Sequence, residues 1–155
     1  MASVARYCCC GDPCVQCDPT GAGLAPKNGT FSGWADAPGG FCASVQFSNP
    51  WVYVLRQSTS DYCNWIWSNG SADITLYFSK QAHTTTAFGA CNKTFAEGDW
   101  YLRAGVQFIC GTTDWLEKTT GFACSGGRVS GSHTFGLMCS ACGACNDSPT
   151  FTVPA

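Results

Sequence analysis

Residues 62–78 read Tyr62-Cys-Asn-Trp-Ile-Trp-Ser-Asn-Gly-Ser-Ala-Asp-Ile-Thr-Leu-Tyr-Phe, and this stretch carries the clearest structural signal in the chain. Two runs of aromatic and β-branched residues flank Asn69-Gly70. Both residues of an Asn-Gly pair accept the positive φ that a tight hairpin turn requires. The stretch therefore predicts two antiparallel strands joined by a short turn.

Similar short runs occur on both sides of this hairpin, and no apolar period of 3.6 residues persists over about 12 residues. Further strands are predicted at 41–47, 51–55, 84–90, 100–110, 121–124, 133–138 and 150–153. We expect an all-β fold, a β-sandwich or flattened barrel of about eight to ten short strands with cysteine-rich termini. Residues 1–155 would form a single domain, in which 31–138 make the β core and the segments 1–30 and 139–155 clasp it.

The composition excludes several classes of protein. Charged residues make up 12% of the chain, and eight Lys and Arg stand against ten Asp and Glu, a balance that does not suit a nucleic-acid binder. The 21 aromatic residues (six Trp, five Tyr and ten Phe) argue against disorder. No apolar run approaches the roughly 20 residues of a membrane helix. We expect neither a nucleic acid nor a membrane as partner.

The N-terminal residues do not resemble a secretory signal, which needs about 7–15 apolar residues after a basic start. Met1-Ala-Ser-Val-Ala-Arg-Tyr runs directly into Cys8-Cys9-Cys10. We therefore expect synthesis in the cytoplasm without a signal peptide, followed by incorporation into a virion or cell-surface assembly.

Thirteen cysteines raise the question of metal ligation. Eight of them form two clusters, at residues 8–17 and 139–145, and each cluster contains a C-x-x-C element whose turn lets two thiolates converge on one zinc ion at about 2.3 Å. Chain termini often lie close together in a domain, so the two elements could complete one tetrahedral site. The predicted zinc ligands are Cys14, Cys17, Cys139 and Cys142, with Cys10 and Cys145 as substitutes.

Disulfides are the alternative use of the cysteines, and we weight it slightly above metal binding. Cys42, Cys63, Cys110 and Cys124 stand singly in strand-like segments, which suits cross-strand bridges. Proximity in sequence suggests the pairs Cys42–Cys63 and Cys110–Cys124. A mixed state, with metal at the termini and bridges in the sheets, stays open, and the odd number leaves at least one thiol over.

Residues suited to catalysis are sparse, and we expect no enzyme. His83 and His133 are the only histidines, and either could serve a Cys–His pair, although an edge or exposed position is the commoner role. No pair of carboxylates stands out, and the chain lacks G-x-S-x-G, H-E-x-x-H and a phosphate-binding glycine loop.

Trp65 and Trp67 share one face of a predicted strand, because side chains two residues apart point the same way. Both indoles could be presented to a sugar or to a protein partner. The alternative is that these rings fill the space between two sheets, as a buried Trp does in many sandwiches.

Several short motifs carry a resemblance that covers most of the chain. They are the N-terminal C-x-x-C followed by Pro, then Asn28-Gly-Thr-Phe, Cys63-Asn-Trp, and a last cysteine before Pro149-Thr-Phe-Thr-Val. In this layout the chain resembles small cysteine-rich β-proteins of planctomycete-like bacteria and of tailed bacteriophages. The resemblance implies a tail or surface component and no catalytic residues.

We therefore expect a non-enzymatic structural protein of a virion or surface assembly, of the phage tail or capsid type, whose partners are other structural subunits. The alternative is a carbohydrate-binding or adhesive module that binds glycan through exposed Trp65 and Trp67. A weaker alternative is a small zinc-binding protein.

Overall fold

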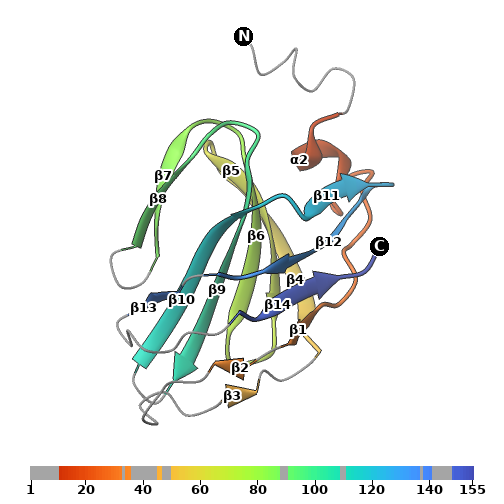
Figure 1. Cartoon of the computed structure of the whole chain (residues 1–155). Coiled ribbons are helices and arrows are strands. Elements are labelled where there is room, and N and C mark those ends of the chain that lie inside the picture. The colour runs from red at the N-terminus through yellow and green to blue at the C-terminus, as the bar shows by residue number, and fades with distance from the viewer. Residues whose placement is uncertain are drawn as a thin grey trace.

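The computed structural model describes residues 11–32, 34–35, 45–46, 50–87, 91–108, 111–136, 138–140 and 148–155 (Figure 1). Antiparallel strands dominate this part of the chain, which confirms the all-β prediction, and they form several open sheets with no closed barrel. The only helix described there, α2 (Pro13–Gln16), is a single turn. It is too short to span a membrane.

Ten of the 14 strands in the described residues have four or more residues. The four shorter strands are β1 (Thr30–Ser32) and β13 (Met138–Ser140), of three residues each, and β2 (Trp34–Ala35) and β3 (Val45–Gln46), of two residues each. The longer strands are β4 (Val52–Ser58), β5 (Tyr62–Ser68), β6 (Asp73–Ser79), β7 (His83–Ala87), β8 (Cys91–Phe95), β9 (Trp100–Phe108), β10 (Gly111–Thr119), β11 (Phe122–Ser125), β12 (Arg128–Thr134) and β14 (Thr150–Val153).

Two larger sheets make up the body of the molecule (Figure 1). One has six strands in the order β13-β10-β9-β6-β5-β4, and the other has four in the order β1-β14-β12-β11. The hairpins β2–β3 and β7–β8 form separate two-stranded sheets. All pairings among the described strands are antiparallel, and antiparallel neighbours can be joined by short turns.

The predicted hairpin at 62–78 is confirmed as β5 and β6. Asn69 Oδ1 accepts hydrogen bonds from the backbone N–H groups of Ser71 and Ala72, both at 2.9 Å, and Gly70 takes a φ of +93° that only glycine adopts without strain. The turn sets the register, in which Trp65 lies opposite Leu76 and Trp67 opposite Ile74.

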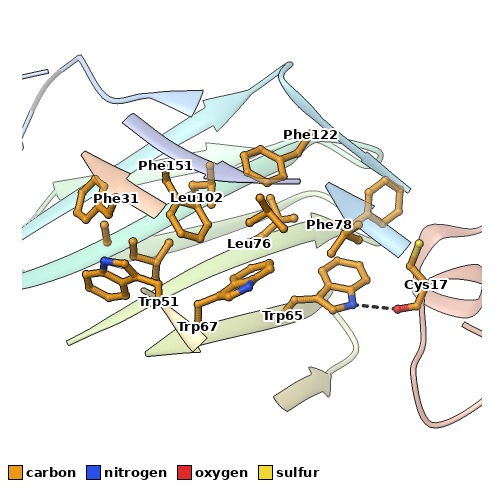
Figure 2. Close-up of a cluster of buried hydrophobic side chains, with 14 of the residues drawn as sticks. Cys17, Phe31, Trp51, Trp65, Trp67, Leu76, Phe78, Leu102, Phe122 and Phe151 are labelled. Carbon is orange, nitrogen blue, oxygen red and sulfur yellow. Dashed lines mark hydrogen bonds between the residues drawn. The ribbon is translucent and has the colours of Figure 1, made fainter. Parts of the chain in front are cut away.

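The inner faces of the two larger sheets enclose the main hydrophobic core (Figure 2). Trp65, Trp67 and Leu76 project from the six-stranded sheet toward Phe122 and Phe151 of the four-stranded sheet, and all five are at least 96% buried. This face-to-face packing is the sandwich arrangement expected from the short alternating strands. Burial of each such side chain contributes roughly 1.5–3 kcal/mol before its cost in entropy.

The chain crosses from one sheet to the other between β10 and β11, through Thr120 and Gly121 alone. A Cβ on Gly121 would lie 1.9 Å from the carbonyl oxygen of Ser132, and one on Gly131, at φ +151°, would lie 2.0 Å from the carbonyl oxygen of Gly121. Because neither position has room for a side chain, this pair of glycines permits the tight passage between the sheets.

A second, smaller aromatic cluster lies on the outer face of the six-stranded sheet. Phe95 of β8 stacks on Tyr101 at a centroid distance of 3.7 Å, and Tyr101 stacks on Tyr77 at 4.5 Å. Leu116 completes the cluster. The β7–β8 hairpin therefore forms a partial third layer over the six-stranded sheet.

Candidate interaction surface

The single turn of α2 connects both sheets through two disulfides. Asp12 caps the turn by accepting a hydrogen bond from Cys14 N at 2.9 Å, and Pro13 occupies the first helical position, where its missing N–H costs nothing. Cys14 is bonded to Cys63 of β5, and Cys17 is bonded to Cys124 of β11. One C-x-x-C element thus links the six-stranded sheet to the four-stranded sheet covalently.

These bonds make the predicted zinc site wrong as to Cys14 and Cys17. A cysteine in a disulfide has no thiolate to give to a metal, so neither residue can be a ligand. Cys142, Cys10 and Cys145 lie outside the described residues, as does the side chain of Cys139. Within the described residues, no group of three or more His, Cys, Asp or Glu side chains could hold a metal ion.

The structure confirms that Cys63 and Cys124 form disulfides, but the predicted pairing is wrong for both. Cys63 is bonded to Cys14 within α2 and Cys124 to Cys17 at the C-cap of α2, at sequence separations of 49 and 107 residues respectively. The prediction assumed that cysteines near in sequence would pair, whereas the fold places α2 at one end of the sandwich, between the two sheets. The expected partners Cys42 and Cys110 lie outside the described residues.

Trp65 and Trp67 are both 0% exposed, so the prediction that they form a sugar-binding platform is wrong. The Trp65 indole N–H donates to the carbonyl of Cys17 at 2.9 Å, and that of Trp67 donates to the carbonyl of Lys27 at 3.0 Å (Figure 2 draws the first). Both rings anchor the segment that follows α2 and have no face left for a ligand.

Each histidine is held by neighbours other than cysteine. The Nε2 of His83 is 2.8 Å from the Tyr101 hydroxyl, and its Nδ1 is 2.8 Å from the carbonyl oxygen of Gln81. The Nε2 of His133 is 2.8 Å from Glu117 Oε1. In the described part of the chain neither imidazole contacts a sulfur, so the geometry gives no support to a Cys–His pair.

The Tyr101 hydroxyl makes the contribution of the outer aromatic cluster to stability depend on pH. Burial raises the pKa of its hydroxyl above the ordinary 10.0, while a hydrogen bond with Thr85 opposes that shift. Because the folded state holds this proton more tightly than the unfolded chain, its stabilising effect is complete below pH 10.0 and is lost as the pH rises toward the higher folded pKa.

We expect the free energy of unfolding to fall above pH 10, and Tyr101→Phe to weaken that fall. Urea unfolding at a series of alkaline pH values measures how steeply the free energy of unfolding falls in the unchanged protein and in the variant. Tyr53→Phe is the control: burial also raises the pKa of Tyr53, but Tyr53 is less buried than Tyr101. Equal slopes for Tyr101→Phe and the unchanged protein would contradict the expectation.

The edge strand β4 is the most accessible apolar element among the described residues. Val52, Val54 and Leu55 are 48%, 53% and 40% exposed, although Val and Leu are usually buried. β4 pairs with β5 on one side only, and a bulge at Val54 shifts the register between Tyr53 and Leu55. On its other side, the pairing given by the described strands is a single bridge, from Trp51 to Gly29.

The one charged side chain of β4 is turned away from this edge. Arg56 lies 3.3 Å from the Asp18 carboxylate and donates to the carbonyl of Cys14, so α2 and the residues after it hold its guanidinium. Natural sheets commonly protect an edge with exposed charges, Lys above all. β4 lacks that protection along Val52–Leu55.

The backbone of β4 beyond the bulge has a defined outward side. The Thr59 N–H donates to the Tyr62 carbonyl at 2.7 Å, which makes Thr59 and Tyr62 a hydrogen-bonded pair. In an antiparallel ladder such pairs alternate, so Leu55 and Gln57 direct their backbone groups to β5. Arg56 and Ser58 therefore direct theirs away from the sheet.

The outer face of the four-stranded sheet is lined with hydroxyl groups. Ser132 lies 2.9 Å from Thr152, and Thr134 lies 2.8 Å from Thr150, measured between side-chain oxygens. In register with Thr152 and Thr150, β1 adds Thr30 and Ser32. We call these six residues the hydroxyl face; it carries no charge and no large apolar side chain.

The part of the chain that the structure describes thus has an all-β, disulfide-linked sandwich architecture, in which β4 is an exposed, apolar edge strand. No protein-family model, no curated protein and no solved structure matches it. Sequence reasoning found β4 as a strand but missed its edge position. That position depends on which strand finally pairs with β5, and the apolar run Trp51-Val-Tyr-Val-Leu does not encode it.

Proposed function

We propose that this chain is a non-enzymatic structural subunit of a virion or cell-surface assembly, and that it works by contacting other protein subunits. The observation that carries the proposal is the β4 edge, with three apolar side chains 40–53% exposed and with the one charged side chain of the strand, Arg56, paired with Asp18. An exposed strand of this kind is a ready template for pairing with another chain.

The hydroxyl face and the covalent clasp at α2 support the same role. A surface without charges loses little solvation energy when a neighbouring subunit covers it. Two disulfides that tie both sheets together suit a protein that has to keep its shape under mechanical or chemical stress. The glycan alternative has lost its basis, because Trp65 and Trp67 are buried.

The test is co-purification of the chain with an assembly. Intact particles and the cell-surface fraction of the producing organism would be separated from dissolved protein, and the chain quantified in each by mass spectrometry. We expect most of it in the assembled fraction, and much less of a Val54→Lys variant there. Leu24→Lys is the matched control, because Leu24 is 49% exposed, close to the 53% of Val54, but lies outside β4.

Recovery of the unchanged chain in the dissolved fraction alone would contradict the proposal. Equal incorporation of Val54→Lys and Leu24→Lys would show that assembly, if it occurs, does not use β4.

A further inference from the structure

We propose that the partner of β4 is β4 of a second copy of this chain, paired antiparallel across a two-fold axis so that two six-stranded sheets become continuous. This inference rests on the proposed function, since it names the partner for the same edge. It depends on three properties of β4: the direction of its free backbone groups, its charges and its length.

The outward backbone groups of β4, which no other described strand pairs beyond the bulge, supply the bonds. Arg56 and Ser58 direct their N–H and C=O groups away from β5, in the regular part of the strand beyond the bulge at Val54. A second β4 offers the same groups with the same spacing. A two-fold contact of one strand with itself satisfies both copies at once and closes the assembly as a dimer.

The charges favour self-pairing in the antiparallel sense. The guanidinium of Arg56 is already paired with Asp18 at 3.3 Å, so it adds no repulsion. A second cation, Lys80, is held at the C-terminal end of β4, where its Nζ donates to the Ser58 hydroxyl at 2.5 Å and to the Thr59 carbonyl at 2.7 Å. An antiparallel arrangement puts the two copies of Lys80 at opposite ends of the contact, whereas a parallel one would bring them together.

Strand length decides between the available edges. Counted over the described residues, β4 has seven residues, but β13, the opposite edge of the same sheet, has three, and the edges β1 and β11 of the other sheet have three and four. A head-to-tail contact between β4 and β13 would therefore form a shorter ladder, and it would build a ring or an open filament and not a closed dimer. The β4–β4 contact uses the longest of these edges on both sides.

Two variants test the pairing while leaving the backbone bonds between β4 and β5 in place. Val54→Lys places a charge at a half-exposed position, and Ser58→Pro removes an N–H that points away from β5, a position at which edge strands tolerate proline. Leu24→Lys is again the control, because Leu24 bonds through its N–H to Gly127 in the turn between β11 and β12. Circular dichroism of each variant would show whether the sheets are intact.

Sedimentation equilibrium over a range of concentrations measures the assembly. We expect the unchanged protein and Leu24→Lys to rise from 16.4 kDa toward twice that mass, and both β4 variants to stay at 16.4 kDa. In parallel, amide hydrogen exchange should slow at Arg56 and Ser58 as the concentration rises. The amides of Leu55 and Gln57 already bond to β5 and should exchange slowly at every concentration.

A monomer at all concentrations, or self-association that both β4 variants leave unchanged, would overturn the inference. Either result is compatible with recovery of the chain in an assembled fraction, in which case the proposed function would stand with a different contact. A β4-dependent dimer that is absent from every assembled fraction would support the inference and contradict the proposed function.

Discussion

Replacing Cys17 and Cys124 together by alanine is expected to lower the free energy of unfolding by about 4–5 kcal/mol. The bridge closes a loop with a sequence separation of 107 residues, so its loss gives the unfolded chain much more freedom. It also removes one of the two covalent links at α2, the one that reaches the four-stranded sheet. The stability of a typical domain is only about 5–15 kcal/mol, so a change of this size decides whether the protein folds reliably.

Guanidinium unfolding of the oxidised proteins measures the effect. Val15→Ala is a control in the same turn, because Val15 is 66% exposed and its truncation should change stability by no more than about 0.5 kcal/mol. A loss below about 1 kcal/mol in the double alanine variant would mean that the Cys14–Cys63 bridge alone keeps the unfolded chain compact.

The second large effect is expected at Phe31, where alanine should cost about 3–5 kcal/mol. Phe31 lies in the three-residue strand β1 and is fully buried. Its ring meets those of Trp51, Trp115, Phe135 and Phe151 edge-on, at centroid distances of 5.6–6.3 Å. Truncation would remove all four contacts and leave a cavity that these large, fixed rings cannot fill.

Thermal and urea unfolding of Phe31→Ala would show this loss, which corresponds to a fall in Tm of about 10 °C for a chain of this length. Phe31→Leu keeps most of the volume and is expected to lose about half as much stability or less. Equal losses for the two variants would show that the edge-on aromatic contacts, and not the cavity, determine the effect.

Local sequence predicted the strands that combine apolar alternation with a clear turn. Thr150–Val153 and the hairpin of β5 and β6 are of this kind, because their burial and their turn residues are visible in the chain itself. β10 was missed. Its Gly-Thr-Thr-Asp-Trp-Leu-Glu-Lys-Thr sequence contains three charged residues, a pattern that does not suggest a nine-residue strand.

The structure shows why β10 tolerates those charges. Asp114 is 2% exposed and lies 2.8 Å from Arg103 of β9, while Lys118 lies 3.1 Å from Asp99. A carboxylate is accepted inside a sheet when a neighbouring strand supplies its cation. Such partners are known only once the strands are paired, so this strand could not be recognised from its own residues.

The disulfide partners of the cysteines and the edge position of β4 could not be predicted from local sequence for the same reason. C-x-x-C at Cys14 and Cys17 was read as two groups converging on one ion, but the turn of α2 separates them toward Cys63 and Cys124 in different sheets. Likewise, exposure of Val54 follows from the strand order, which places β4 last. Both features depend on the arrangement of whole sheets.

The two bridges from α2 also determine how the protein would respond to a protease. A single cut anywhere between Cys17 and Cys124 produces two peptides that the Cys17–Cys124 bond still joins, and a cut between Cys17 and Cys63 leaves them joined twice. Exposed turns such as that around Ser60 can therefore be nicked without loss of mass. The fragments would separate only after reduction, so the two disulfides keep the molecule in one covalent piece after a single cleavage of this kind.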